Sequence, residues 1–180
     1  MARLEPPKME ELTEEQKAIY AAITRSRPRV SGPFGVWLRI PPIADAANKL
    51  VNSIRDTGKI EKRLYEFIVM IVAAHWTASY AWAAHEQTAK DVGIAPDVIE
   101  AIRTGKKPNF TKQDEAIIYD AVTSLLRNRK LGDDTYQALL KMFGLDMTIE
   151  IISVAGIYSM IATVINGFEV PTPNGEKPFA

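Results

Sequence analysis

Residues 62–92 of this chain, KRLYEFIVMIVAAHWTASYAWAAHEQTAKDV, contain the features that decide its fold. The first half is a long apolar run interrupted near its start by one acidic residue, Glu66. Both histidines of the protein, His75 and His85, also lie in this stretch. Because an isolated charge is costly to bury, the Glu66 carboxylate needs a partner or must take up a proton. We predict that Glu66 and His85 form the polar centre of a functional site in an all-helical protein.

The composition favours one globular domain. The 180 residues suffice to bury a core, and the absence of cysteine excludes disulfides, thiolate metal sites and thiol redox chemistry. The 22 basic and 22 acidic side chains balance, so we expect neither nucleic acid nor a membrane as a partner. The first residues, MARLEPPKMEEL, contain no apolar core of signal-peptide length, and we expect a cytoplasmic protein.

Helical periodicity and helix-ending residues predict an all-α fold of seven to eight helices. Residues 1–30 are expected to form an N-terminal arm and helix, and residues 31–180 a helical domain, within a single domain overall. The segment 30–42, VSGPFGVWLRIPP, is too rich in Gly and Pro for a long helix, although Phe34 and Trp37 should turn inward. The predicted helices span residues 13–24, 42–57, 61–77, 79–93, 95–104, 111–128, 135–143 and 147–166. Their expected N-caps are Thr13, Thr77 or Ser79, Thr111, and Asp133 or Asp134.

Two of these helices, 61–77 and 147–166, are apolar on nearly all sides. A monomer of this size can bury one such helix completely. The second should meet another subunit, so we predict a homo-oligomer.

Spacing alone does not join Glu66 to His85. Their helices should form an antiparallel pair, with Glu66 some eleven residues before the connection and His85 six to seven after it. At a rise of about 1.5 Å per residue the two side chains are level only if the helices cross at an angle. Glu66 could instead pair with Lys62 or Arg63 on its own helix, and His85 could be a satisfied core histidine.

Three segments resemble the carboxymuconolactone decarboxylase family, which includes the AhpD-type alkylhydroperoxidases. They are the pattern AAxxxxxYxWAAH, the following VGIAPDVIEAIR and the closing NGFEVPTPNG, and the likeness extends over roughly residues 34–175. The resemblance implies an AhpD-like helical bundle that assembles as a trimer or hexamer. It also implies paired roles for Glu66 and His85.

The family's peroxidase branch carries a Cys-x-x-Cys pair with a histidine inside it. The corresponding positions are Ala78, Ala81 and Tyr80. Peroxide reduction in that branch needs an attacking and a resolving thiol, so this chain should not be a thiol peroxidase. The likeness is therefore to the decarboxylase branch, whose reaction uses no metal or organic cofactor.

This resemblance implies acid–base chemistry on a small lactone or cyclic acid, or a non-enzymatic ligand-binding or scaffold role on the same fold. In the enzymatic case His85 supplies a proton, Glu66 holds the imidazole, and Tyr80 donates a hydrogen bond to a developing oxyanion. We expect His75 to be structural and no metal site, because the two histidines are not at a metal-ligand spacing. The expected substrate-binding residues are Trp82, Trp37, Phe34 and Arg39, with Arg55 and Arg63 as further candidates for binding a carboxylate.

Overall fold

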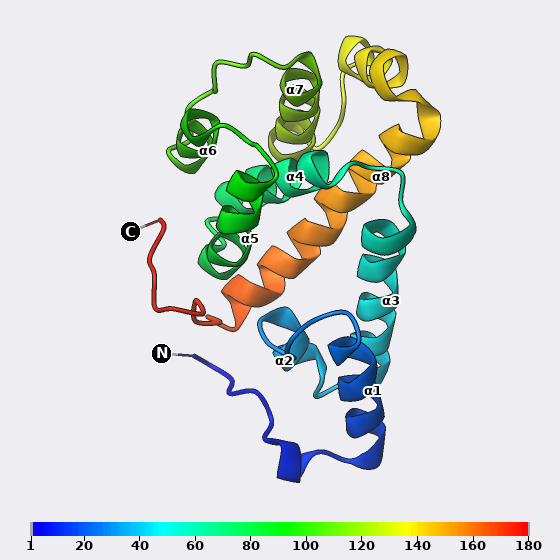
Figure 1. Ribbon diagram of the computed structural model, residues 1–180, viewed down its shortest axis with the longest axis vertical. Helices are drawn as coiled ribbons and strands as arrows, with labels where there is room; N and C mark the ends of the chain where they lie inside the picture. The colour runs from blue at the N-terminus through cyan, green and yellow to red at the C-terminus, as the bar shows by residue number, and fades with distance from the viewer. Residues whose placement is uncertain (1, 180) are drawn as a thin grey trace.

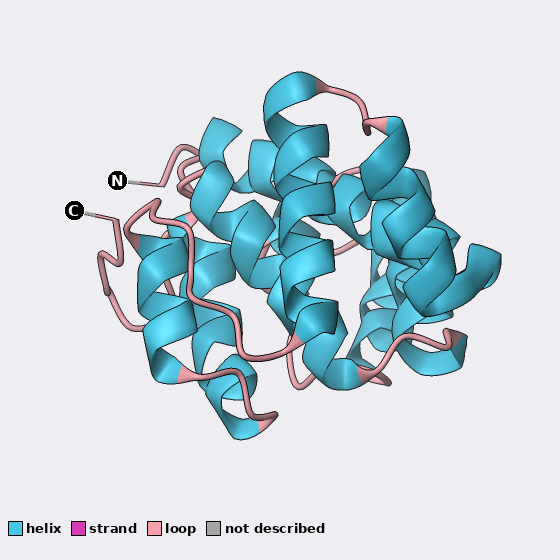
Figure 2. Ribbon diagram, turned by 90° about the horizontal axis from the view of Figure 1, so that it is seen from above, coloured by secondary structure: helices cyan, strands magenta, loops and turns pink. Residues whose placement is uncertain are grey.

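The computed structural model describes residues 2–179, and within that range every regular element is helical (Figure 2). The predicted all-α class is confirmed, with eight α-helices preceded by one 3₁₀ turn. The elements are η1 (Met9–Glu11), α1 (Glu14–Thr24), α2 (Pro33–Trp37), α3 (Pro41–Thr57), α4 (Lys62–His75), α5 (Ser79–Asp91), α6 (Pro96–Arg103), α7 (Gln113–Asn128) and α8 (Asp133–Gly167).

Helix α4 is the centre of the core. Ten consecutive residues, 64–73, are buried, because their side chains are apolar on nearly every side of the helix. The helix contacts α5, α6, α7 and α8. Figure 1 shows α8 running past the α4–α5 pair, with α3 on its other side. Glu66 is the one acidic residue in this buried run, so its position deep in the bundle follows from the apolar residues around it.

Helix α8 is two helical segments joined at Gly144, where the backbone has φ 74° and ψ 175°. The sequence prediction of separate helices on either side of this glycine is confirmed. Among the described residues, α8 is the one helix with the length and composition to cross a membrane. Half of its most apolar window is buried inside the protein, where α8 packs on α4 and α7. It therefore serves here as a core helix.

The N-terminal part packs on the bundle through α3 and through direct contacts of α2 with α8. Thr13 caps α1 as predicted: its hydroxyl accepts from the Gln16 amide, and the Gln16 side chain accepts from the Thr13 amide. The Gly- and Pro-rich segment contains only the short helix α2, and Phe34 and Trp37 are buried as predicted.

Three of the predicted N-caps are wrong. The structure places Ala78 before α5, Lys112 before α7 and Gly132 before α8, none with a side-chain cap. At α5 the reason is the tight reversal after α4. Thr77 takes a positive φ of 46°, and the Ala78 amide bonds back to the Ala73 carbonyl.

The C-terminal tail packs on its own chain. The Phe179 ring lies edge-on against Trp82, and Arg103 donates to the Pro178 carbonyl. The two ends of the chain also meet, since Arg3 pairs with Glu169 at 2.6 Å.

Candidate active site

A cavity of about 830 Å³ opens where the segment before α2 meets α3, α4, α5 and α8. Its polar lining includes Glu66 from α4, His85 and Tyr80 from α5, and Tyr158 from α8. The remaining wall mixes apolar with polar and basic side chains and is completed by residues 173–174 of the tail. The cavity is large enough for a small organic molecule.

Glu66 and His85 are hydrogen-bonded across the α4–α5 pair. The Oε2 atom of Glu66 lies 2.7 Å from Nδ1 of His85. The glutamate is only 6% exposed, whereas the histidine side chain is 24% exposed. Because Nδ1 is held by the carboxylate, Nε2 is the nitrogen left for exchange with a ligand.

The alternative pairing of Glu66 with a base on its own helix is wrong. Arg63 points to α7 instead, where it pairs with Asp114 and Glu115, the latter at 2.7 Å. The Glu66–His85 contact exists because α5 crosses α4 at an angle as it folds back, which brings residues at unequal distances from the turn together (Figure 1).

Two tyrosines extend this pair into the core. The Tyr158 hydroxyl lies 3.4 Å from His85 Nε2, and the Tyr65 hydroxyl lies 3.0 Å from that of Tyr158. Burial raises the pKa of Tyr158 well above its ordinary value, and the neighbouring Tyr65 raises it further. Burial likewise raises the pKa of Tyr65. Both phenols therefore stay protonated near neutral pH and can donate hydrogen bonds.

Hydrogen bonding along this chain is consistent with either charge state of the imidazole. With neutral His85, Nδ1–H donates to Glu66 and Nε2 accepts from Tyr158, which in turn accepts from Tyr65. With protonated His85, Nε2–H donates to the Tyr158 oxygen and Tyr158 donates to Tyr65. His85 can thus take or give a proton at Nε2 without leaving a buried hydroxyl unpaired.

Four basic residues line the cavity: Arg27, Arg29, Arg55 and Lys62. Arg55 from α3 is neutralised by Asp56, with Nε and Oδ1 at 2.9 Å. Arg27 lies just after α1, and its guanidinium stacks 4.1 Å from the centre of the Phe34 ring. Burial lowers the pKa of Arg27, and the nearby Arg55 lowers it further.

The other predicted residues divide into two groups. Tyr80 and Phe34 line the cavity, and the Tyr80 hydroxyl is 2.9 Å from Ser31 Oγ. Trp82, Trp37 and Arg39 lie outside the lining. Trp82 is fully buried. Its indole nitrogen donates to Glu86, and its ring packs against Phe179 of the tail.

Trp37 packs edge-on against Phe34, and Arg39 is at the surface with its guanidinium on the Glu5 carbonyl. The geometry therefore corrects the placement of these two residues and of Trp82. Of the three arginines considered for a carboxylate, Arg55 alone lines the cavity, since Arg63 is occupied by α7.

Sequence reasoning missed Tyr65, Tyr158 and Arg27. The two tyrosines stand within apolar helices, and a buried hydroxyl there signals a hydrogen-bonded partner without naming it. Arg27 precedes a proline in a polar loop, where an arginine carries no signal of its own. Over residues 2–179, no cluster of three or more His, Asp or Glu side chains is arranged to hold a metal ion.

No protein-family model and no curated protein matches this chain. Solved structures do. A peroxidase-related protein from Silicibacter sp. TM1040 aligns with a TM-score of 0.74 and 15% identity, covering 94% of this chain and 90% of its own. A protein from Ralstonia eutropha JMP134, described as an alkylhydroperoxidase AhpD core, aligns at 0.78 and 14%, covering 99% and 94%.

The debrominase Bmp8 aligns at a TM-score of 0.67 and 13% identity, covering 94% of this chain and 91% of its own. A cysteine-to-alanine variant of Bmp8 has been solved in complex with 2,3,4-tribromopyrrole. Identities this low establish architecture and not activity. The chain has the all-α fold of the AhpD-like, peroxidase-related proteins.

Proposed function

We propose that the cavity is the active site of a cofactor-independent lyase that resembles 4-carboxymuconolactone decarboxylase and acts on a small lactone or cyclic acid. One observation carries this proposal: His85 is held at Nδ1 by a buried carboxylate and has Nε2 beside a protonated tyrosine in a cavity of substrate size. Such an arrangement is suited to moving one proton.

The proposed reaction needs no group beyond these side chains. The bond between the ring carbon and the substrate carboxylate breaks, and CO₂ leaves. The electron pair enters the conjugated lactone carbonyl as an enolate. The imidazolium Nε2–H of His85 then protonates carbon, and the proton is replaced from solvent.

Tyr80 supports the charge that develops on the substrate oxygen. Its hydroxyl reaches the cavity from the first turn of α5 and is oriented by Ser31. A phenol held in this way can donate a hydrogen bond to an enolate oxygen. Ser31 lies in the segment before α2, so this orientation comes from outside the α4–α5 pair.

The fold neighbours support a small-molecule site without fixing the reaction. One of them is a debrominase with a pyrrole complex. Thiol chemistry is excluded for this chain, because the full sequence contains no cysteine.

The test uses purified protein with 4-carboxymuconolactone and related unsaturated lactone acids, following CO₂ release and ultraviolet absorbance. We expect turnover by the wild type and a loss of about 10²- to 10⁴-fold in His85→Ala and Glu66→Gln, the range typical of general acid–base catalysis. His75→Ala is the matched control, since His75 lies outside the cavity. Turnover that survives both substitutions would overturn the mechanism, and no turnover on any of these acids would overturn the lyase assignment.

A further inference from the structure

Arg27, Arg29, Arg55 and Lys62 line the cavity, and of these four cations Arg27 is the one that is not exposed. Among the residues that the structure describes, no carboxylate lies within ion-pair distance of its guanidinium. Asp56 is bound to Arg55 instead. Removing a positive charge from water without a counter-ion is costly, even when the burial is partial, so a ligand that supplies the opposite charge is favoured here.

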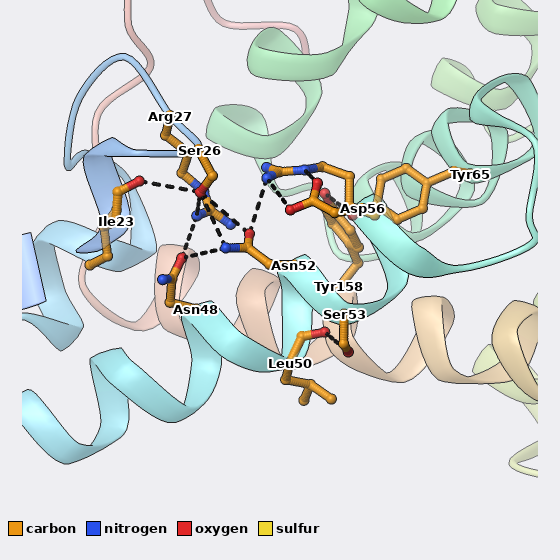
Figure 3. A network of polar contacts seen from close by, with 11 residues as sticks. Ile23, Ser26, Arg27, Asn48, Leu50, Asn52, Ser53, Asp56, Tyr65 and Tyr158 are labelled. Carbon is orange, nitrogen blue, oxygen red and sulfur yellow. Dashed lines mark hydrogen bonds and ion pairs between the residues drawn. The ribbon is translucent and has the colours of Figure 1, made fainter. Parts of the chain in front are cut away.

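The guanidinium is held in place by neutral partners only. Its Nη1 donates to Asn48 Oδ1 at 2.6 Å and to Ser26 Oγ at 3.1 Å, and Asn48 is itself buried and bonded to Asn52 at 3.3 Å. Figure 3 shows Arg27 directed into this cluster. The Phe34 ring supports one face of the guanidinium. These contacts fix the orientation of the Arg27 guanidinium and leave its positive charge without a counter-ion.

One nitrogen of the Arg27 guanidinium makes none of these contacts. Nη2 of Arg27 is covered by protein and has no hydrogen-bond partner. An unmet donor in a charged group is rare in a folded core and calls for an explanation. Arg27 lines the cavity, so an anion bound there is a partner available to this nitrogen if the side chain turns toward it.

We propose that Arg27 binds the carboxylate of the ligand, so that the cavity takes an unsaturated organic carboxylate whose body faces His85. This inference rests on the proposed site and names its substrate class. The apolar part of the wall, which includes Phe34, Val51 and Ile161, suits a hydrocarbon body.

The test is calorimetric titration of the full chain at pH 7.5 with benzoate and sorbate, their neutral amides, and phenyl phosphate. We expect both carboxylates to bind, and the amides to bind at least about tenfold more weakly because they lack the charge. Arg27→Gln should weaken carboxylate binding by about 10- to 100-fold. Arg27→Lys, which keeps the charge but loses the planar fork, should fall between these.

Arg25→Gln is the matched control, because Arg25 is an exposed arginine of the same segment outside the cavity. Circular dichroism of each variant verifies folding. Equal binding by Arg27→Gln and wild type, equal binding of acid and amide, or no binding of either carboxylate would overturn the proposal. Tighter binding of phenyl phosphate than of benzoate would reassign the site to phosphate and overturn the carboxylate.

His85→Ala separates this inference from the proposed function. Carboxylate binding should persist in His85→Ala, since the anion is held by Arg27. Carboxylate binding by the wild type, with no lactone acid turned over by the wild type, would leave the carboxylate site intact and refute the lyase. Turnover that is unchanged in Arg27→Gln would support the lyase and refute the carboxylate site at Arg27.

Discussion

The hydroxyl of Tyr158 lies 3.4 Å from Nε2 of His85, on the opposite side of the imidazole from Glu66. The two rings meet edge to face, with centroids 5.4 Å apart. Helix α8 therefore completes a site that begins on α4 and α5. The histidine has a hydrogen-bonding partner at each ring nitrogen, which fixes the plane of the ring as well as its proton positions.

The two buried tyrosine hydroxyls should be energetically coupled. Tyr158→Phe leaves the Tyr65 hydroxyl without its partner, and we expect a loss of about 1–3 kcal/mol in the free energy of unfolding. Tyr65→Phe should cost less, because Tyr158 keeps His85. The double variant should cost less than the sum of the two, since no buried hydroxyl of the pair is then left unmatched. Urea unfolding of all four proteins measures this, and strict additivity would contradict it.

Stability should fall at alkaline pH because of the same pair. The pKa values of both phenols are raised in the folded protein, chiefly by burial, whereas an unfolded tyrosine ionises near its ordinary pKa of about 10. The contribution of these two phenols to stability is fully present below a pH of about 10. It is lost as the pH rises from that value toward the raised pKa values of the folded protein, because the unfolded chain releases protons that the folded chain keeps.

We expect the free energy of unfolding to decline more steeply from pH 9 to 11 in the wild type than in the Tyr65→Phe/Tyr158→Phe variant. The difference approaches about 1.4 kcal/mol per pH unit for each tyrosine once the unfolded phenol is ionised. Lysine titration affects both proteins alike and cancels in the comparison. Parallel curves measured by urea unfolding would show that the phenols are not protected.

Gly32 should be needed for the placement of Tyr80. Its φ is +61°, and a Cβ there would lie 2.4 Å from Cε1 of the Tyr80 ring. Gly32 has a ψ of −135°, outside the left-handed helical region, so Gly32→Ala should cost about 1–3 kcal/mol for the backbone and a further penalty for displacing the ring. Gly144→Ala is the control, because its φ of +74° and ψ of 175° also lie outside the left-handed helical region and nothing lies near the added methyl. Equal losses of unfolding free energy in the two variants, measured by urea unfolding, would mean that the Tyr80 ring moves aside at no cost.

The predicted homo-oligomer is testable at exposed apolar residues. Leu145 and Ile149 of α8 are 57% and 55% exposed, and Ile43 and Leu50 of α3 are also exposed. Exposed apolar side chains on a folded protein can mark sites of association. We expect light scattering after size exclusion to give a multiple of 20.0 kDa, and Ile149→Glu to shift it toward the monomer. A wild-type monomer at micromolar concentration would refute the prediction.

Most of the fold could be predicted from local sequence, because helix ends depend on nearby residues. Thr13 with Gln16 defines one start, and Gly144 breaks α8 where the sequence indicated. The failures are local as well. Thr77 was expected as a cap, but the reversal between α4 and α5 needs its positive φ and leaves Ala78 in the capping position.

The sequence by itself determined that one carboxylate is buried in the central helix and that no thiol is present. It did not determine what the carboxylate meets, because periodicity along a helix carries no information on the angle at which the next helix crosses it. Only the tertiary structure decided that Glu66 meets His85, and that the hydroxyl of Tyr158, 73 residues beyond His85, lies 3.4 Å from its other nitrogen. It also brought Arg27 to the same cavity from the N-terminal segment. These contacts are set by packing between segments distant along the chain.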